Sequence, residues 1–213
     1  VNFYGREYKV NANVLIPRQD TEILVEEVMK LTNSESRVLD MCTGSGCIII
    51  SLAASGHTSE NGAVAIDISD DALKVADYNK KYNNADYIKL IKSDMFSSSE
   101  CEQYKNEDNR FDVIVSNPPY IPTKDIDELS EEVRLHDPVL ALDGDTDGLK
   151  FYKAITKQSV NYLKENGYLC YEIGYNQAED VRNIMEQCGY SGIKVIKDLA
   201  GLDRIATGIY SRR

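Results

Sequence analysis

The sequence predicts an α/β fold: a doubly wound, mostly parallel, seven-stranded sheet with helices on both faces, preceded by an N-terminal β-hairpin and helix. Two observations predict it. Strand-like apolar segments alternate with helical patterns of about 10–15 residues, which is typical of βαβ units. A glycine-rich turn follows the first of these strands, at residues 38–39. Wound sheets bind ligands at such turns, so we expect a ligand site at the carboxyl edge of the sheet.

The elements before the sheet form the first part of this architecture. Residues 3–16 predict a hairpin, and the apolar spacing after them predicts a helix that begins at Asp20 or Thr21. We assign residues 1–35 to this N-terminal unit and residues 36–213 to the domain that carries the sheet. The hairpin and helix are expected to pack on that domain.

Strands and helices then alternate along the domain. The predicted strands share short apolar runs and cover residues 38–39, 63–68, 87–91, 111–115, 168–173, 193–196 and 204–210. The predicted helices share apolar residues at helical spacing and cover residues 48–54, the segment after 69–71, 148–163 and 178–188. The polar stretch 97–109 predicts a surface connection with a short helical piece.

Composition limits the possible function classes. The chain of 213 residues is 42% hydrophobic, and residues 1–16 show no signal-peptide core. No apolar run approaches the ~18 residues needed to span a bilayer. We therefore expect a cytoplasmic, monomeric protein with no membrane partner. The net charge of −11 opposes broad binding to a polyanion, so extended nucleic acid is not expected as a partner.

Metal and disulfide chemistry are not predicted. The five cysteines are odd in number, form no C-x-x-C pair and lie mostly in apolar segments, as reduced core thiols do. His57 and His136 have no partner spacing that indicates zinc or a Ser-His-Asp triad. The sequence therefore predicts no metal site.

The segment Asn117-Pro118-Pro119-Tyr120 is the strongest functional signal in the chain. Proline has no N–H, so this turn offers carbonyl acceptors without neighbouring backbone donors. The Asn117 side-chain oxygen and the Pro118 carbonyl can each accept one hydrogen of an NH₂ group and aim its nitrogen for attack, while Tyr120 stacks on the substrate plane. A proline-stiffened loop after a buried strand is the alternative interpretation.

Three aspartates are expected beside the glycine-rich turn Thr43-Gly44-Ser45-Gly46. Asp40, Asp67 and Asp94 each lie at the end of a predicted strand, and such ends meet at one edge of a parallel sheet. Asp67 follows Gly46 at roughly the 20-residue interval expected of a ribose-binding acid. This pattern fits either a dinucleotide or S-adenosylmethionine.

Charge and glycine placement separate these two cofactors. A dinucleotide usually needs a third glycine, where this chain has Ile49, and Asp40 would repel its phosphates. S-adenosylmethionine has no phosphate, and Asp40 is a favourable neighbour for its cationic amine and sulfonium. Asp67 can then accept from the ribose hydroxyls and Asp94 from the adenine amine. A turn or helix-capping carboxylate is the alternative interpretation of each aspartate.

Several sequence blocks together carry a family resemblance. In chain order they are Phe3-Tyr4-Gly5, Leu15-Ile16-Pro17-Arg18-Gln19-Asp20-Thr21-Glu22, Val38-Leu39-Asp40 with Thr43-Gly44-Ser45-Gly46, Asn117-Pro118-Pro119-Tyr120-Ile121, Tyr171-Glu172-Ile173-Gly174 and Asp198-Leu199-Ala200-Gly201-Leu202-Asp203-Arg204. Through them the chain resembles the class I S-adenosylmethionine-dependent methyltransferases, with their Rossmann-like fold. More narrowly, it resembles the HemK/PrmC family of protein-glutamine methyltransferases, over nearly its whole length. The N-P-P-Y motif marks amino-methyltransferases in general, and its combination with the block around Arg18 is much more specific.

The resemblance implies a reaction and a set of site residues. The reaction is methyl transfer from S-adenosylmethionine to the side-chain amide nitrogen of the glutamine in the Gly-Gly-Gln motif of a peptide chain release factor, with S-adenosylhomocysteine as product. The implied catalytic residues are Asn117, Pro118 and Tyr120. The implied substrate-binding residues are Asn117, Pro118, Pro119, Tyr120, Arg18 and Glu172. The implied cofactor-binding residues are Asp40, Thr43, Gly44, Gly46, Asp67, Ile68, Asp94, Met95 and Asn117.

Three features depart from the family pattern. Cys42 stands where a glycine is common, so that turn position is less permissive. Gln19 replaces the proline usual in the Pro-Arg-Pro-Asp-Thr-Glu block, which reduces rigidity and leaves the chemistry unchanged. Family members also begin with a small helical domain that helps to recognise the release factor, and we expect that this sequence, which starts at Val1, does not contain it.

Other activities share parts of the pattern. An N6-adenine nucleic-acid methyltransferase also presents an NH₂ group to such a loop, but the net charge of −11 disfavours it. A ribosomal-protein glutamine methyltransferase shares the loop, and the continuation Asp20-Thr21-Glu22 favours the release-factor group. An NAD-dependent oxidoreductase needs the third glycine and an acid/base residue that the sequence does not show. A non-catalytic adaptor would have no need to keep N-P-P-Y intact.

Overall fold

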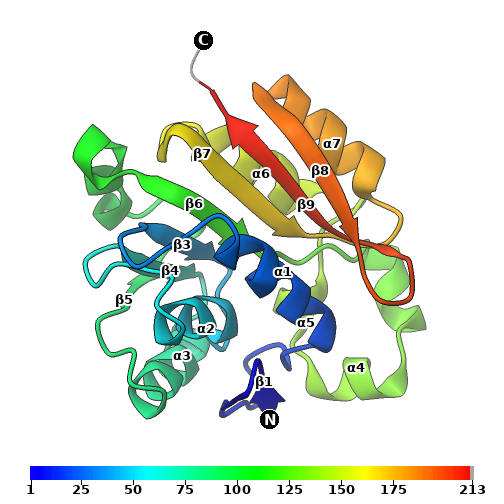
Figure 1. Cartoon of the computed structure of the whole chain (residues 1–213). Coiled ribbons are helices and arrows are strands. Elements are labelled where there is room, and N and C mark those ends of the chain that lie inside the picture. The colour runs from blue at the N-terminus through cyan, green and yellow to red at the C-terminus, as the bar shows by residue number, and fades with distance from the viewer. Residues whose placement is uncertain (212–213) are drawn as a thin grey trace.

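The computed structural model describes residues 1–211 and is built on a seven-stranded sheet in the order β5-β4-β3-β6-β7-β9-β8 (Figure 1). Its strands are β3 (Val38–Met41), β4 (Ala63–Asp67), β5 (Lys89–Lys92), β6 (Phe111–Ser116), β7 (Leu163–Glu172), β8 (Tyr190–Lys197) and β9 (Asp203–Tyr210). Strand β9 runs antiparallel to both neighbours, whereas the pairings among β3 to β7 are parallel. The predicted doubly wound, mostly parallel, seven-stranded fold is confirmed.

Helices cover both faces of this sheet. They are α1 (Gln19–Met29), α2 (Cys47–Ala54), α3 (Asp70–Tyr82), α4 (Glu131–His136), α5 (Val139–Leu142), α6 (Lys150–Ser159) and α7 (Ala178–Gln187), with short 3₁₀ helices at Ser99–Lys105, Glu107–Asn109 and Thr123–Glu128. In Figure 1, α1 and α2 lie in front of the sheet and α6 lies behind it. A two-stranded hairpin, β1 (Asn2–Phe3) with β2 (Arg6–Glu7), precedes them.

The core consists of two apolar layers, one on each face of the sheet. Successive residues of a strand point to opposite faces, so Val38 packs with the layer under α1 and α2, while Leu39 packs with the layer under α6 and α7. Strand β4 repeats this alternation with Ala65 and Val64. Burial on both faces explains why these strands read as continuous apolar runs.

Helix α3 begins beside residues 69–71, where the sequence predicts the start of a helix, and Ser69 caps it. The Ser69 hydroxyl accepts a hydrogen bond from the Ala72 N–H at 3.2 Å. Asp70 and Asp71 lie in the first turn and Lys80 and Lys81 in the last, which complements the helix dipole at both ends. This arrangement fixes the start of α3 beside the end of β4, where the site described below lies.

Two predicted elements differ from the structure at their boundaries. The predicted hairpin over 3–16 was wrong beyond Glu7, because the Lys9 backbone pairs with the Asn79 side chain and not with a strand. The Lys9 N–H donates to Asn79 Oδ1 at 2.8 Å, and the Lys9 carbonyl accepts from Asn79 Nδ2 at 2.9 Å. The predicted helix over 148–163 ends at Ser159, and Leu163 instead pairs with β6 at the start of β7.

The predicted surface connection over 97–109 is helical but not wholly at the surface. Cys101 and Tyr104 are buried in it, and the Tyr104 ring lies 5.0 Å from the ring of Phe111. This segment therefore closes one end of the core. The division of the chain at residues 35 and 36 stays a prediction, and the last two residues of the predicted domain 36–213 lie outside the described residues.

The chain between β6 and α6 contains short elements that the sequence does not predict. The Ile121 N–H donates to Leu142 at 3.0 Å, and the Ile121 carbonyl accepts from the Gly144 N–H at 2.8 Å, so this excursion is closed at its base. Helices α4 and α5 lie within it. Of the helices in residues 1–211, none has the length and apolar character needed to cross a membrane.

Candidate active site

A cavity of about 280 Å³ lies at the carboxyl ends of four parallel strands. Gly44 lines it after β3, Asp67 at the end of β4, Asp94 after β5 and Asn117 after β6. These are the four positions that the sequence places at one edge of the sheet, and the structure brings them together. Thr43, Ile68, Met95 and Pro119 also line this cavity.

The glycine-rich turn forms one wall of the cavity in a left-handed backbone conformation. Gly44 has φ +55°, and an added Cβ there would meet no atom within 4 Å, so its backbone faces open space. Gly46 has φ +81°, and a Cβ there would lie 2.7 Å from Ile50 Cδ1. Gly46 thus serves close packing of the turn on α2 and does not line the cavity. Cys42 also has positive φ, at 62°, which is uncommon for a residue other than glycine.

Asp40 lies beneath this turn and is fully buried. Its Oδ2 accepts from the Thr43 hydroxyl at 2.6 Å, while its Oδ1 has no hydrogen-bond partner within the described part of the chain. Burial raises the pKa of Asp40 to about 7. Asp40 is not among the residues that line the cavity, so the structure shows it supporting the turn from below.

This burial predicts a pH dependence of stability. The pKa of Asp40 rises from its ordinary value of 3.8 to about 7 on folding, so its contribution to stability is present below about pH 4 and is lost as pH rises through 7. We expect the free energy of unfolding, measured with urea, to fall between about pH 4 and pH 7. Asp40→Asn should show a smaller fall, and exposed Asp86→Asn should behave as wild type. Equal slopes for all three proteins would contradict this assignment.

Asp67 connects the turn to the start of α3. Its Oδ2 accepts from the Gly44 N–H at 2.8 Å, and its Oδ1 accepts from the Ser69 N–H at 2.9 Å. Burial raises the pKa of Asp67, and these two backbone donors oppose that effect. A carboxylate oxygen has further acceptor sites, so Asp67 can also accept from a ligand in the cavity. Asp94 is exposed at the rim of the same cavity.

Asn117 lines the cavity at the end of β6. Its Nδ2 donates to Thr21 Oγ1 at 3.3 Å. No donor among residues 1–211 reaches Asn117 Oδ1 or the carbonyl oxygen of Pro118. Asn117 lines the cavity, whereas Pro118 is buried and is not among the lining residues. Acceptance of a substrate N–H by Asn117 Oδ1 and by the Pro118 carbonyl stays a prediction.

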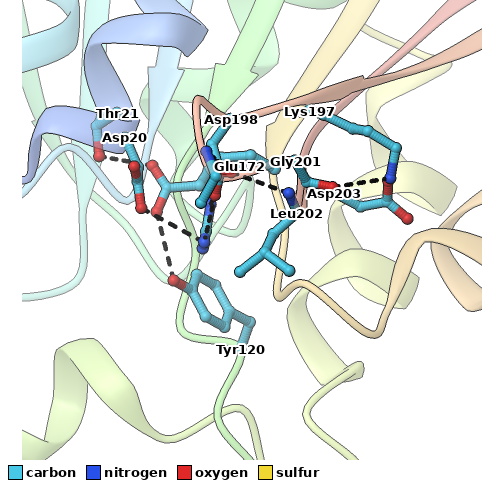
Figure 2. A network of polar contacts seen from close by, with 11 residues as sticks. Asp20, Thr21, Tyr120, Glu172, Lys197, Asp198, Gly201, Leu202 and Asp203 are labelled. Carbon is cyan, nitrogen blue, oxygen red and sulfur yellow. Dashed lines mark hydrogen bonds and ion pairs between the residues drawn. The ribbon is translucent and has the colours of Figure 1, made fainter.

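Tyr120 and Glu172 lie behind this loop and do not line the cavity. The Tyr120 hydroxyl donates to Glu172 Oε1 at 3.4 Å, a contact visible in Figure 2. Glu172 is 3% exposed, and burial raises its pKa to about 6. The predicted stacking of Tyr120 on the substrate and substrate contact by Glu172 stay predictions, and the structure assigns both side chains a hydrogen bond with each other.

Arg18 does not line the cavity, but it connects two segments that do. It forms an ion pair with Asp137, a buried aspartate that also accepts from the Ile16 N–H at 3.0 Å. This pairing joins residues 13–17 to residues 138–141, and members of both segments line the cavity. Contact between Arg18 and the substrate stays a prediction.

Sequence reasoning did not identify Thr21 and Asp137 as residues of the site. Thr21 is 2% exposed, lines the cavity and contacts Asn117. The spacing of Thr21 to Leu24 and Val28 puts it on the apolar face of α1, which could have marked it as a buried polar residue with a partner. Asp137 lies between two helices of six and four residues, α4 and α5, which are too short to show a periodic signal.

Comparison with known proteins places this geometry in a family. A family model described as a methyltransferase domain matches residues 32–205. The release factor glutamine methyltransferase of Thermodesulfovibrio yellowstonii is 40% identical over 207 residues, which cover 95% of this chain and 71% of that protein. The protein of the same name from Fusobacterium nucleatum is 40% identical over 205 residues, which cover 95% of this chain but only 56% of that protein.

A solved structure supports the same fold. The release factor-specific protein-(glutamine-N5) methyltransferase from Alicyclobacillus acidocaldarius matches with a TM-score of 0.53 and 24% identity, over 96% of this chain and 100% of that chain. At this identity the match concerns the fold alone. Together with the sequence relatives, the family model shows that the chain belongs to the methyltransferase domain family and, within it, to the release factor glutamine methyltransferases.

Proposed function

We propose that this protein transfers a methyl group from S-adenosylmethionine to the side-chain amide nitrogen of the glutamine in the Gly-Gly-Gln motif of a peptide chain release factor. One observation supports the proposal: Asn117 lines the cavity, and neither its Oδ1 nor the carbonyl of the next residue, Pro118, accepts from a donor among the described residues. A primary amide has two N–H bonds to offer them. The release factor glutamine methyltransferases that match this chain support the same substrate.

The residues around the cavity fit S-adenosylmethionine. The open backbone of Gly44 leaves room for close approach of a ligand, and Asp67 has acceptor sites for ribose hydroxyls. Asp94 at the rim can accept from an adenine amine. Two carboxylates at the cavity suit a ligand that is cationic and carries no phosphate. When bound, S-adenosylmethionine supplies a methyl group on a sulfonium, which leaves as the neutral thioether of S-adenosylhomocysteine.

The protein's contribution to the reaction is positioning. An amide nitrogen is a weak nucleophile because its lone pair is delocalised into the carbonyl. Asn117 Oδ1 and the Pro118 carbonyl each accept one N–H of the glutamine amide, which directs the nitrogen lone pair toward the methyl carbon and stabilises the positive charge that develops on nitrogen. After a C–N bond has formed, the nitrogen is acidic and loses one proton to water. No general base is required.

Substrate choice is the part of the proposal most open to a direct test. An N6-adenine methyltransferase would present its NH₂ group to the same two acceptors, but the net charge of −11 opposes binding to a polyanion. With equimolar release factor and adenine-containing DNA, we expect the methyl label on the release factor. A ribosomal protein containing glutamine serves as the third competitor. Preferential labelling of DNA or of the ribosomal protein would contradict the assignment.

We infer that the natural substrate is bound by more than this cavity. The chain spans 56% of the F. nucleatum relative and 71% of the T. yellowstonii relative, so those proteins contain further residues that can contact a substrate. Because release factors work on ribosomes, we place the activity in the cytoplasm.

A further inference from the structure

Behind Asn117 lies a chain of hydrogen bonds that draws on three separate elements. The Asn117 Nδ2 donates to Thr21 Oγ1 at 3.3 Å, and the Thr21 hydroxyl donates to Glu172 Oε2 at 2.5 Å. Asn117 follows β6, Thr21 lies in the first turn of α1, and Glu172 ends β7. Figure 2 shows Thr21 and Tyr120 approaching the two oxygens of Glu172 from different sides.

The protons in this chain have one consistent arrangement while Glu172 is ionised. A carboxylate only accepts hydrogen bonds, so Thr21 must donate its single hydroxyl proton to Glu172. The Thr21 oxygen is then left as an acceptor toward Asn117, and only the NH₂ side of the Asn117 amide can satisfy it. The amide oxygen must therefore face away from Thr21. This assignment follows from the hydrogen-bond donors and acceptors of the three side chains alone.

The surroundings hold Glu172 in place. Thr21 and Glu172 are 2% and 3% exposed, so water does not compete for these bonds. The Tyr120 hydroxyl donates to Glu172 Oε1 at 3.4 Å, and the Tyr152 hydroxyl donates to the backbone carbonyl of Glu172 at 3.0 Å.

We propose that Thr21 and Glu172 are positioning residues that fix the Asn117 side-chain amide with its oxygen toward the substrate. The inference rests on the proposed function, because that orientation matters only if Asn117 Oδ1 accepts a substrate N–H. It goes beyond the proposed function because it assigns the selectivity of the site for an NH₂ donor to two further residues, Thr21 and Glu172, of which Glu172 does not line the cavity. Glu172, predicted from sequence to bind substrate, acts in this account through Thr21.

Protonation of Glu172 reverses the chain. A neutral carboxyl can donate to the Thr21 oxygen, so Thr21 can donate to Asn117 Oδ1, and the amide then turns its NH₂ group toward the substrate. The groups that face Glu172 and influence this equilibrium are Arg204, Asp20, Tyr120, Tyr152 and Cys47. Because burial raises the pKa of Glu172 to about 6, kcat should fall as pH drops through 6.

The activity test compares isosteric and conservative replacements of Thr21. Thr21→Val keeps the shape but removes the hydroxyl, and we expect kcat to fall by about 10-fold to 100-fold with the cofactor Kd unchanged, the scale of a misplaced reacting group. Thr21→Ser keeps the hydroxyl and should restore most of the activity and the acid limb of the pH profile. Glu172→Gln should lose that acid limb. A Thr21→Val enzyme with wild-type kcat would overturn the inference while leaving the proposed function intact.

A second measurement needs no substrate and separates the two proposals. In the free protein, the side-chain amide signals of Asn117, assigned by their absence in Asn117→Asp, should titrate by NMR with a midpoint near pH 6 in wild type and in Thr21→Ser. They should not titrate in Glu172→Gln or Thr21→Val. If no methyl acceptor is found but this titration appears, the chain stands and the proposed function fails. Flat Asn117 signals in wild type, or an unchanged titration in Glu172→Gln caused by another acid such as Asp40, would overturn the inference.

Discussion

Replacing Asn117 with alanine is expected to lower kcat by roughly 10²–10³-fold, the scale seen when one preorganised polar contact to a transition state is deleted. Asn117 lines the cavity, its side-chain oxygen has no donor from the described residues, and its Nδ2 donates to Thr21. Removing the amide therefore leaves the substrate amide with one acceptor, the Pro118 carbonyl. Cofactor affinity should stay nearly unchanged. Single-turnover kinetics at saturating S-adenosylmethionine measures this step directly.

Two further variants make the Asn117 result specific. Asn117→Asp keeps an acceptor oxygen at the same place, so it should retain more activity than Asn117→Ala. Asn161→Ala removes an exposed asparagine from the turn between α6 and β7 and should leave kcat at the wild-type value. If Asn117→Ala is folded and has a near-wild-type kcat, the N-P-P-Y loop is only a structural turn.

Replacing Asp67 with alanine is expected to weaken cofactor binding by about 100-fold or more. The Asp67 carboxylate holds the Gly44 and Ser69 N–H groups at 2.8 and 2.9 Å while lining the cavity. Its removal releases the glycine-rich turn and deletes an acceptor for ribose hydroxyls. Hydrogen bonds to a charged group contribute about 1.5–3 kcal/mol each. The loss of the bonds from two ribose hydroxyls to the Asp67 carboxylate therefore accounts for a fall in cofactor affinity of this size. Isothermal calorimetry with S-adenosylhomocysteine gives the affinity without turnover.

The control for Asp67 keeps the change in charge and moves it away from the cavity. Asp71→Ala removes a carboxylate from the first turn of α3 that pairs with Lys74 at 2.8 Å, and its cofactor affinity should match wild type. Equal affinities of wild type and Asp67→Ala would remove Asp67 from the cofactor site. Tight binding of NAD by the wild-type protein would point to a dinucleotide instead.

The sheet could be predicted from sequence because its strands are apolar on both faces. An apolar run such as Phe111–Ser116 predicts a strand that is buried on both faces, and apolar residues at helical spacing predict the helices between the strands. Four residues at the ends of these strands, including Asp67 and Asn117, could be placed at one edge for the same reason. Parallel strands bring their carboxyl ends together whatever the details of the loops.

The rest of the site depends on contacts that have no local signal. Arg18 looks like a substrate-binding residue in the sequence, but it pairs with Asp137 from a part of the chain where the helices have only four to six residues. Asp40 reads as a charge beside the cofactor, yet burial beneath the turn separates it from the cavity. The partner of Asn117 is Thr21, 96 positions earlier, and local periodicity cannot predict that pairing.

The most direct test of the account is transfer of a radiolabelled methyl group from S-adenosylmethionine to a peptide chain release factor. We expect the label to enter the wild-type release factor at the glutamine of its Gly-Gly-Gln motif, as mass spectrometry of the peptide would show. A release factor with that glutamine replaced by alanine should stay unlabelled, and the Asn117→Ala enzyme should label the wild-type factor far more slowly. Equal labelling of the glutamine and alanine forms, or labelling at another residue, would contradict the account.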